Sequence, residues 1–445
     1  MGISAAPGSM TSEEIVRLSR AHTFFSWSVQ GAIDPIAIDR AEGIYIYTPE
    51  GRRIIDFNSQ LMSVNIGHGD RRVIDAITAQ AAKLQYVQPA FATEIRARLG
   101  AKLAEIMPGD LDKVFFTLGG AEAVENAIKL ARHYTGRTKV LARYRTYHGA
   151  TLGAMTLTGD PRRWANEPAI YGVVRYPDTH RWGVQEPRPV AEALEGLEDV
   201  IRYEGPHTIA AVFLETIVGT NGILIPPDGY LAGVRELCDR YGILMVADEV
   251  MAGFGRTGRW FAVDHWDVVP DLMTMAKGLT SSYLPLGAVA MRHGIAEAFD
   301  TKMFFGGLTY SSHPVSLAAA LATIGVYEAD GLLERSARMG DVLRRHHEAL
   351  AAKHPCVGAT RSLGLFGIID LVRSRDPWTP MTAFNGTSDE MKAVAKHLRD
   401  NGLYTMIANN GIHTNPPLCI TEEQLDEAFG IIDGALSLAD EAVTG

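Results

Sequence analysis

Ionisable side chains stand at the ends of two successive apolar runs. Residues Ile243–Ala247 are apolar at every position and lead directly into Asp248 and Glu249. A second, largely apolar run, Leu272–Ala276, leads into Lys277. Short runs of this kind predict strands that are buried on both faces, as in a parallel sheet. Asp248 and Lys277 would then meet at the carboxyl edge of the sheet, where open α/β sheets bind ligands.

A carboxylate beside a solitary amine matches the needs of pyridoxal phosphate. The acid would keep the pyridine nitrogen protonated, and the lysine would form the Schiff base. A buried carboxylate is costly without a cationic partner, and the pyridinium would be one. Most lysines are solvated surface charges, but Lys277 is the lone lysine between Lys139 and Lys302. An apolar, partly enclosed setting lowers the pKa of a lysine and makes its amine nucleophilic.

Other stretches could complete such a site. Gly119-Gly120-Ala121 lies between a predicted strand and a helix, where free backbone N–H groups bind anions, although glycines at such turns also serve purely steric needs. The spacing is neither a P-loop nor the glycine pattern of dinucleotide folds. Tyr147-His148-Gly149 follows a strand, and its aromatic ring could stack on a planar cofactor or simply pack in a loop. Glu215 ends another buried strand and could cap the next turn or bind a group in the site.

The elements that must position these residues alternate between strand and helix. Strands are predicted over residues 113–117, 140–143, 209–215, 243–248, 272–276 and 286–291, and helices over 11–22, 71–84, 93–106, 120–134, 230–241, 316–329, 332–353, 391–401 and 422–442. Residues 44–47 and 53–57 predict a hairpin, and residues 357–372, 402–405 and 411–415 predict further strands. The alternation implies an α/β fold with a mostly parallel sheet covered by helices, followed by a smaller α+β domain.

Composition limits the classes of function. The chain has 445 residues, which favours two domains, and 47% of them are hydrophobic. A net charge of −10 argues against nucleic acid as a partner.

No apolar run approaches the ~20 residues of a membrane span, and the start does not read as a signal peptide, so we expect a cytoplasmic protein. The three cysteines (Cys238, Cys356, Cys419) form neither a metal-binding spacing nor a disulfide framework, and we expect no metal. Gly8-Ser9 resembles a tag remnant before a native start at Met10.

Taken together, these motifs resemble the class III (subgroup II) aminotransferases of pyridoxal-phosphate fold type I. The resemblance runs from about Phe24 to Ala439. It is strongest at four stretches, which read FTLGGAEA from Phe116, LMVADEVMAGFGRTG from Leu244, AKG around Lys277 and GLTY around Thr309. Tyr147-His148-Gly149 and Asn415–Leu418 also match. The chain is most similar to ω-aminotransferases of the taurine or ω-amino acid:keto-acid type.

The resemblance implies a role for each residue of the site. Lys277 would be the Schiff-base lysine and proton shuttle, and Asp248 would pair with the pyridine nitrogen. Tyr147 and Val250 would pack on the two ring faces. Glu215 and His148 would lie around the ring, while Gly119, Gly120 and Ala121 would bind the phosphate. Thr309 would reach the phosphate of the neighbouring subunit, so the resemblance implies a homodimer, possibly a tetramer.

The resemblance also implies a division of the chain and a substrate pocket. Residues 1–60 would join residues 321–445 in a small domain, and residues 61–320 would form the large cofactor-binding domain. Phe24, Trp27, Met62, Tyr86, Tyr147 and Met406 would line an apolar pocket, although Phe24 and Trp27 could equally just pack onto the body.

The chain departs from the family pattern at two positions. Ala121 stands where the family usually has a serine, so one hydroxyl contact to the phosphate is lost. Many ω-transaminases carry an arginine shortly after the Gly402-Leu403 position that pairs with the substrate carboxylate, but here Met406 stands in its place. A guanidinium–carboxylate pair is a strong recognition device. Its absence leaves the identity of the keto-acid acceptor open.

Three functions therefore compete. The first is a ping-pong transfer of an amino group from a primary amine or ω-amino acid to a keto acid such as pyruvate or 2-oxoglutarate. The second is a decarboxylating transaminase of the dialkylglycine decarboxylase type, or an aminomutase. The third, from a different class, is an inactive homologue that only binds. Retention of both Lys277 and Asp248 favours an active enzyme, since a binder would need neither.

Overall fold

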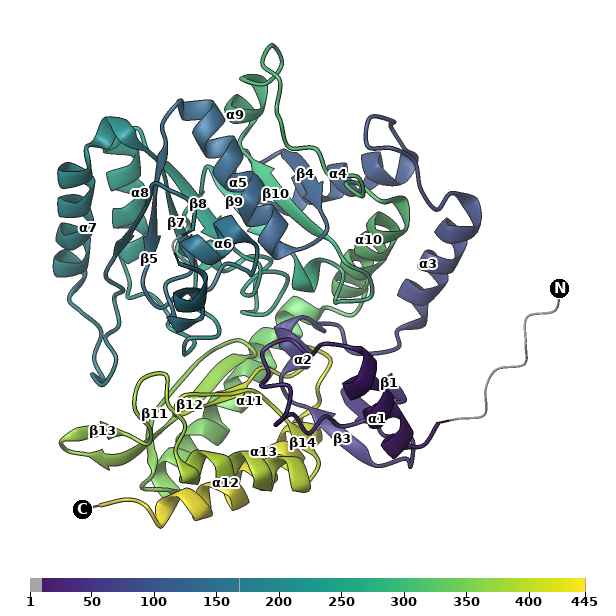
Figure 1. Cartoon of the computed structure of the whole chain (residues 1–445), viewed down its shortest axis with the longest axis vertical. Helices are drawn as coiled ribbons and strands as arrows, with labels where there is room; N and C mark the ends of the chain where they lie inside the picture. The colour runs from purple at the N-terminus through teal and green to yellow at the C-terminus, as the bar shows by residue number, and fades with distance from the viewer. Residues whose placement is uncertain (1–9, 168, 445) are drawn as a thin grey trace.

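A computed structural model describes residues 10–167 and 169–444 of the chain (Figure 1). Its largest sheet has seven strands in the order β4, β10, β9, β8, β7, β5, β6. Their bounds are β4 Lys113–Thr117, β5 Lys139–Arg143, β6 Val173–Tyr176, β7 Ile209–Glu215, β8 Leu244–Asp248, β9 Leu272–Met275 and β10 Gly287–Met291. Strand β10 runs opposite to the other six strands of this sheet. The predicted α/β fold with a mostly parallel sheet is confirmed.

Alternate side chains of the central strands enter two separate apolar cores. Phe213 and Val246 pack with α5 (Gly120–Thr135) and α6 (Leu152–Leu157) on one face. Val212 and Met245 pack with α7 (Val190–Glu204) and α8 (Tyr230–Tyr241) on the other. Because side chains of a strand alternate between faces, a run that is apolar at every position can fill both cores at once.

Two smaller sheets are built from the two ends of the chain. One has the order β1 (Arg40–Glu42), β2 (Tyr45–Tyr47), β3 (Arg53–Asp56), β14 (Leu403–Tyr404), with β14 parallel to β3. The other is antiparallel, with β11 (Val357–Leu363), β12 (Phe366–Arg375), β16 (Gly411–Thr414) and β15 (Ile407–Ala408) in order and β13 (Trp378–Pro380) beside β12. N-terminal and C-terminal residues thus share one sheet. The domain boundaries at residues 60 and 320 stay a prediction.

The remaining helices cover these sheets. They are α1 Ser12–His22, α2 Ser59–Met62, α3 Arg71–Lys83, α4 Glu94–Ile106, α9 His293–Glu297, α10 Pro314–Ala329, α11 Leu332–Lys353, α12 Asp389–Asp400 and α13 Glu422–Asp440, with short 3₁₀ helices η1 Pro161–Asn166, η2 Pro206–Thr208, η3 Ala262–His265 and η4 Lys277–Leu279. The expected tag remnant Gly8-Ser9, which precedes the expected native start at Met10, lies outside the described residues. Within residues 10–167 and 169–444, no single helix could cross a membrane by length and composition, while the pair α10 and α11 passes that test only together, across a bend of 62°.

The strands and helices expected from the sequence are present, with small differences at their ends. The sequence patterns did not predict β6 or α7. Strand β6 is a four-residue edge strand with a half-buried pattern, and α7 follows Pro189, whose side chain cannot cap a helix. Neither segment therefore has the alternation or the capping signal that marks its type.

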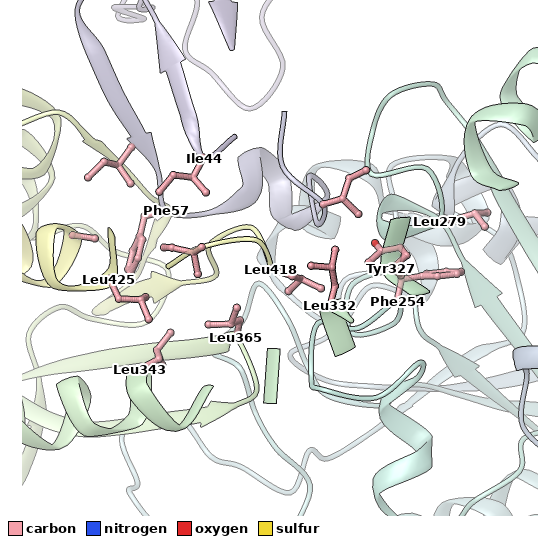
Figure 2. Close-up of a cluster of buried hydrophobic side chains, with 14 of the residues drawn as sticks. Ile44, Phe57, Phe254, Leu279, Tyr327, Leu332, Leu343, Leu365, Leu418 and Leu425 are labelled. Carbon is pink, nitrogen blue, oxygen red and sulfur yellow. The ribbon is translucent and has the colours of Figure 1, made fainter. Parts of the chain in front are cut away.

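One apolar core links the ends of the chain to the large sheet. Figure 2 shows Ile44 and Phe57 from the N-terminal segment beside Leu425 of α13 and Leu343 of α11. The same cluster continues through Leu418 and Leu332 to Phe254, Leu279 and Tyr327. Leu279 ends the short helix that begins at Lys277. The small sheets are therefore packed continuously against the segment that carries the lysine.

Replacement of Phe213 should test the central core. Phe213 is fully buried in β7, so Phe213→Ala leaves a cavity and should lower the free energy of unfolding by about 3–5 kcal/mol. Thermal unfolding, followed by circular dichroism, measures the loss. Tyr203→Ala on the exposed side of α7 is the control and should change stability by less than about 0.5 kcal/mol. Equal effects of the two substitutions would contradict the packing described.

Candidate active site

The carboxyl edge of the large sheet brings two acids and a lysine together. Strands β7, β8 and β9 are parallel neighbours, with Glu215 opposite Asp248 and Asp248 opposite Thr274. Lys277 follows β9 after one intervening residue, Ala276. The expectation that the ends of β8 and β9 place Asp248 and Lys277 at the same edge is confirmed. Three ionisable groups in one place require specific partners, because isolated buried charges are costly.

Asp248 is held by two donors. Its Oδ1 accepts a hydrogen bond from the backbone N–H of Val250 at 3.0 Å. Its Oδ2 lies 2.7 Å from Nδ1 of His148. Both side chains are buried, and the described residues offer no partner to the second ring nitrogen of His148. The carboxylate is therefore fixed in orientation, and a pair of this kind can direct one acid at a bound ring.

Glu215 joins the same wall through backbone donors. One of its oxygens accepts the N–H of Tyr147 at 2.8 Å, and the other accepts the N–H of Gly219 at 2.8 Å. Burial raises the pKa of Glu215, and the neighbouring Asp248 charge adds to that rise, while His148 opposes it. The acid thereby fixes the loop that carries Tyr147 to the end of β7.

The surroundings of Lys277, as well as its position, make its amine a candidate nucleophile. Burial lowers the pKa of its amine, and the charges of Asp248 and Glu215 oppose that effect. Its φ of 40° is in the left-handed region, which a lysine rarely adopts. The next residue, Gly278, is enclosed, since a Cβ there would lie 2.5 Å from Nδ2 of Asn65 and 2.8 Å from Cβ of Phe254. Tyr327 also donates its hydroxyl to the carbonyl of Gly278 at 2.8 Å.

The opposite end of the site is a helix N-terminus. Helix α5 begins at Gly120, and its N-cap residue Gly119 has no side chain to bind the first N–H groups. Gly120 packs closely on Val250, because a Cβ there would lie 2.9 Å from Cγ1 of Val250. A helix start of this kind presents free backbone N–H groups and the positive end of the helix dipole to an anion.

A cavity of about 300 Å³ connects these groups. Its walls hold eight of the residues singled out from the sequence, namely Gly120, Ala121, Tyr147, His148, Glu215, Asp248, Val250 and Lys277. Five further residues line it, namely Gly149, Ala150, Thr220, Met251 and Ala276. Acid, amine and helix N-terminus thus line one common cavity.

The other predicted residues lie around or away from the cavity. Trp27 meets the ring of Tyr147 edge-on, with ring centroids 5.6 Å apart. Met62 is buried in an apolar cluster with Met251, and Met406 packs against that cluster. Phe24 does not line the cavity, and it is 86% exposed.

Tyr86 and Thr309 lie together outside the cavity. The hydroxyl of Tyr86 donates to the carbonyl of Thr309 at 2.8 Å. Thr309 is exposed and does not contribute to the cavity of its own chain. Its predicted role toward a neighbouring subunit stays a prediction.

Comparison with known proteins identifies the family. The family model "Aminotransferase class-III" matches residues 28–436. The chain belongs to the class III aminotransferases. It is 35% identical over 426 residues to an omega-aminotransferase of Caulobacter vibrioides, covering 91% of this chain and 94% of the relative. It is 31% identical over 450 residues to a taurine–pyruvate aminotransferase of Bilophila wadsworthia, covering 96% of this chain and 98% of the relative.

A solved structure agrees with this assignment. The taurine:2-oxoglutarate aminotransferase of Bifidobacterium kashiwanohense, in complex with PLP and glutamate, superimposes with a TM-score of 0.95 at 38% identity. The match covers 98% of this chain and 100% of the other. As a class III aminotransferase, the enzyme depends on pyridoxal phosphate.

The residues around the cavity fit this cofactor. The helix N-terminus at Gly120 and Ala121 suits its phosphate, and Asp248 suits its ring nitrogen. The amine of Lys277 suits its aldehyde, and the rings and methyl groups of Tyr147 and Val250 suit the two faces of a flat ring.

Several residues in and around the cavity wall were not singled out from the sequence. Thr220 and Met251 line the cavity but belong to loops whose path is set only by tertiary packing. Arg162 was also missed, although its guanidinium carbon lies 3.8 Å from the centre of the Tyr147 ring. The turn chemistry of Asp160-Pro161 marks a helix start, but nothing in it indicates which side chain the next residue will meet.

The close packing at Gly278 should control the position of the lysine. Gly278→Val would push against Asn65 and Phe254 and displace the backbone that carries Lys277, so the purified protein should lose most of its pyridoxal phosphate. Cofactor content after gel filtration measures this. Gly325→Ala is the control, because a Cβ on this exposed glycine of α10 meets nothing within 4 Å. Full cofactor retention in Gly278→Val would contradict the argument.

Proposed function

We propose that this class III aminotransferase is an ω-aminotransferase. It moves an amino group from a primary amine or ω-amino acid, such as taurine, β-alanine or an aralkyl amine, to pyruvate or 2-oxoglutarate by a ping-pong mechanism. The observation that carries the proposal is the shared cavity of Lys277, Asp248 and the start of α5. The named activities of the relatives from Caulobacter vibrioides and Bilophila wadsworthia support the ω-amine class of donor.

Pyridoxal phosphate, when bound, supplies an aldehyde for the amino group and an electron-withdrawing ring. The residues of the chain do the rest. Lys277 takes the proton from the reacting carbon of the donor. In the second half-reaction it delivers a proton to the reacting carbon of the acceptor. Burial lowers the pKa of this amine, which favours the uncharged form that can accept a proton. Asp248 keeps a proton on the ring nitrogen, and His148 holds the carboxylate in place.

The remaining residues would bind the cofactor and orient it. Tyr147 and Val250 pack on the two ring faces, and Glu215 lies beside the ring. Backbone N–H groups of Gly119, Gly120 and Ala121 hold the phosphate without the hydroxyl that a serine would add. Thr309 adds a contact from the neighbouring subunit of a homodimer, which its exposed position permits.

An apolar wall selects the donor. Trp27 and Tyr147 form its aromatic part, and Met62 and Met406 join it through the cluster around Met251. Phe24 and Tyr86 are assigned to the same proposed pocket, although neither lines the cavity of Lys277 in the described residues. A wall of this composition favours donors whose reacting carbon bears no carboxylate, because an apolar surface cannot compensate a buried charge.

Loss of the lysine should abolish transfer. Lys277→Ala should reduce amino transfer from taurine, β-alanine, 4-aminobutyrate and 1-phenylethylamine to background with either acceptor, because no other amine lines the cavity in the described residues. Borohydride reduction of wild-type protein followed by peptide mass spectrometry should place the cofactor on Lys277.

Lys129→Ala, on the exposed side of α5, is the control and should keep full activity. Retained turnover in Lys277→Ala would refute the role of the lysine. Release of carbon dioxide from 2-aminoisobutyrate by the wild type would favour the decarboxylating reaction instead.

Replacement of Asp248 should separate binding from chemistry. Asp248→Asn keeps the shape of the side chain and a hydrogen bond to His148 but removes the charge that holds the ring proton. The rate of amino transfer should fall by a factor on the order of 10²–10³ while the fold remains intact. Stopped-flow measurement of the half-reaction with donor tests this, with the exposed Asp267→Asn as control. A near-normal rate would count against the proposed role.

A further inference from the structure

A second cavity lies on the other side of the loop that follows β7. It holds about 50 Å³ and shares no described lining residue with the cavity of Lys277. Thr220 of this loop lines the cavity of Lys277. The next two residues, Asn221 and Gly222, line the second cavity, and strands β11, β12 and β13 of the small antiparallel sheet supply its facing wall. We call this space between the loop and the small sheet the junction cavity.

The junction cavity is rich in cations. Its wall includes three arginines and a histidine, namely Arg145, Arg181, Arg361 and His180. Asp370 is the one carboxylate among the described residues that line it. That carboxylate already has a partner, because its Oδ2 accepts a hydrogen bond from Nη2 of Arg361 at 2.7 Å. Three guanidinium groups against one acid leave the cavity with an excess of positive charge.

Arg145 is the cation that most needs a partner. Its Nη2 donates to the carbonyl of Asn221 at 2.9 Å, which is the one hydrogen bond of this side chain within residues 10–167 and 169–444. Burial lowers the pKa of the Arg145 guanidinium, and the charges of Asp178 and Asp370 only partly offset that effect. Asp178 is itself paired with Arg143 at 3.0 Å. Because a guanidinium stays charged in a protein, Arg145 keeps a buried charge that these acids do not neutralise.

Arg145 and Arg361 approach the same point of the loop. A Cβ on Gly222 would lie 3.5 Å from Nη2 of Arg145 and 3.7 Å from Nη2 of Arg361. In the part of the chain that the structure describes, Nε and Nη1 of Arg145 and Nη1 of Arg361 have no acceptor. The ring of Trp182 closes one side, with its centre 5.8 Å from the guanidinium carbon of Arg145. A free guanidinium edge with a second guanidinium nearby suits an oxyanion, which accepts two parallel hydrogen bonds from such an edge.

The size of the junction cavity limits the anion. One water needs roughly 10–15 Å³ of such a cavity, so about 50 Å³ holds only a few groups of that size. A phosphate ion or a short carboxylate has this size. A nucleotide, a peptide or a second pyridoxal phosphate is too large. The charge and the volume of the cavity therefore indicate the same class of ligand, a small oxyanion.

We propose that the junction cavity is a second binding site of this protein, for a small oxyanion of the phosphate or short-carboxylate type. Nε and Nη1 of Arg145 bind two oxygens of the anion, and Nη1 of Arg361 adds a third donor. The site is separate from the reaction proposed for Lys277 and does not depend on it. Since the anion supplies the charge that Arg145 lacks, its binding stabilises the contact between the loop after β7 and the small sheet.

Calorimetry of the holoenzyme with inorganic phosphate and with acetate tests the site, and bound cofactor keeps its own phosphate position filled. The wild type should bind one ion per chain here, and Arg145→Gln should weaken that binding by about 10–100-fold, the range of a charge-assisted hydrogen bond. Tighter binding of phosphate or of acetate identifies which of the two classes the site takes. Arg344→Gln is the matched control, because this exposed arginine of α11 pairs with Glu348 at 2.7 Å, away from the cavity, and should bind the ion as the wild type does.

A second variant separates the cavity from the charge. Ala359 lines the junction cavity and lies on the same face of β11 as Arg361, because side chains two positions apart in a strand share a face. Ala359→Leu should therefore fill the space and exclude the ion while both arginines remain. The temperature of thermal unfolding should rise with phosphate in the wild type and in Arg344→Gln, and should not change with phosphate in Arg145→Gln or Ala359→Leu.

Three results would overturn the assignment. Absence of binding of both ions to the wild type would mean that the cavity holds no anion. Equal binding in the wild type and in both cavity variants would mean an adventitious ion only, at another place on the surface. Loss in Arg145→Gln with full binding in Ala359→Leu would mean that the charge acts from outside the cavity. None of these measurements uses amino transfer, so they decide the site even where the proposed ω-aminotransferase function fails.

Discussion

The active site depends on keeping ionisable groups buried at one edge of a sheet. Asp248, Glu215 and Lys277 stand at the ends of adjacent parallel strands, where their charges would be costly without partners. The chain compensates each of the two acids locally: His148 and the N–H of Val250 hold Asp248, and the N–H groups of Tyr147 and Gly219 hold Glu215. Burial lowers the pKa of Lys277, and the charges of Asp248 and Glu215 only oppose that effect. The two acids are therefore held by hydrogen bonds, whereas the surroundings of the amine favour its uncharged, nucleophilic form.

The need to hold these buried groups in place also explains how the ends of the strands in the large sheet are fixed. Strands β7 and β8 fill a core on each face, so their ends are fixed from both sides. The lysine is fixed differently, since it follows β9 in a left-handed conformation and is followed by a glycine enclosed by Asn65 and Phe254. Asn65 in turn accepts a hydrogen bond from the buried Arg256, which also binds the carbonyls of Leu365 and Pro416. The small sheets thereby reach the lysine through packing and hydrogen bonds.

The sequence predicted where Asp248 and Lys277 lie because their placement depends on local patterns. The apolar runs of β8 and β9 place Asp248 and Lys277 at strand ends, and a helix start at Gly120 follows from a glycine turn after β4. The contacts of the wall could not be predicted in this way. Thr220 and Met251 line the cavity from loops after β7 and β8, and Arg162 meets Tyr147 from the short helix η1. No periodicity links such a residue to the side chain it will touch. The edge strand β6 was missed because its pattern is weak. Helix α7 lacks a capping side chain at Pro189, although its buried Ala193, Leu197 and Ile201 recur at helical spacing.

The residues proposed for the reaction and the loop beside the cavity are therefore held in different ways. The acid and the lysine are set by strand pairing, which a single surface substitution does not change. The loop from Thr216 to Leu224 is instead held by Arg145, Arg162 and Arg361, which bind Asn221, Thr220 and Gly222 in turn. Because Thr220 lines the cavity and takes its hydrogen bond from Arg162, a change in this loop alters the wall that meets the substrate while Asp248 keeps its register with Glu215. On the proposed assignment of the site, a substitution in this loop would change the cavity wall while the sheet still holds Asp248 and Lys277 in place.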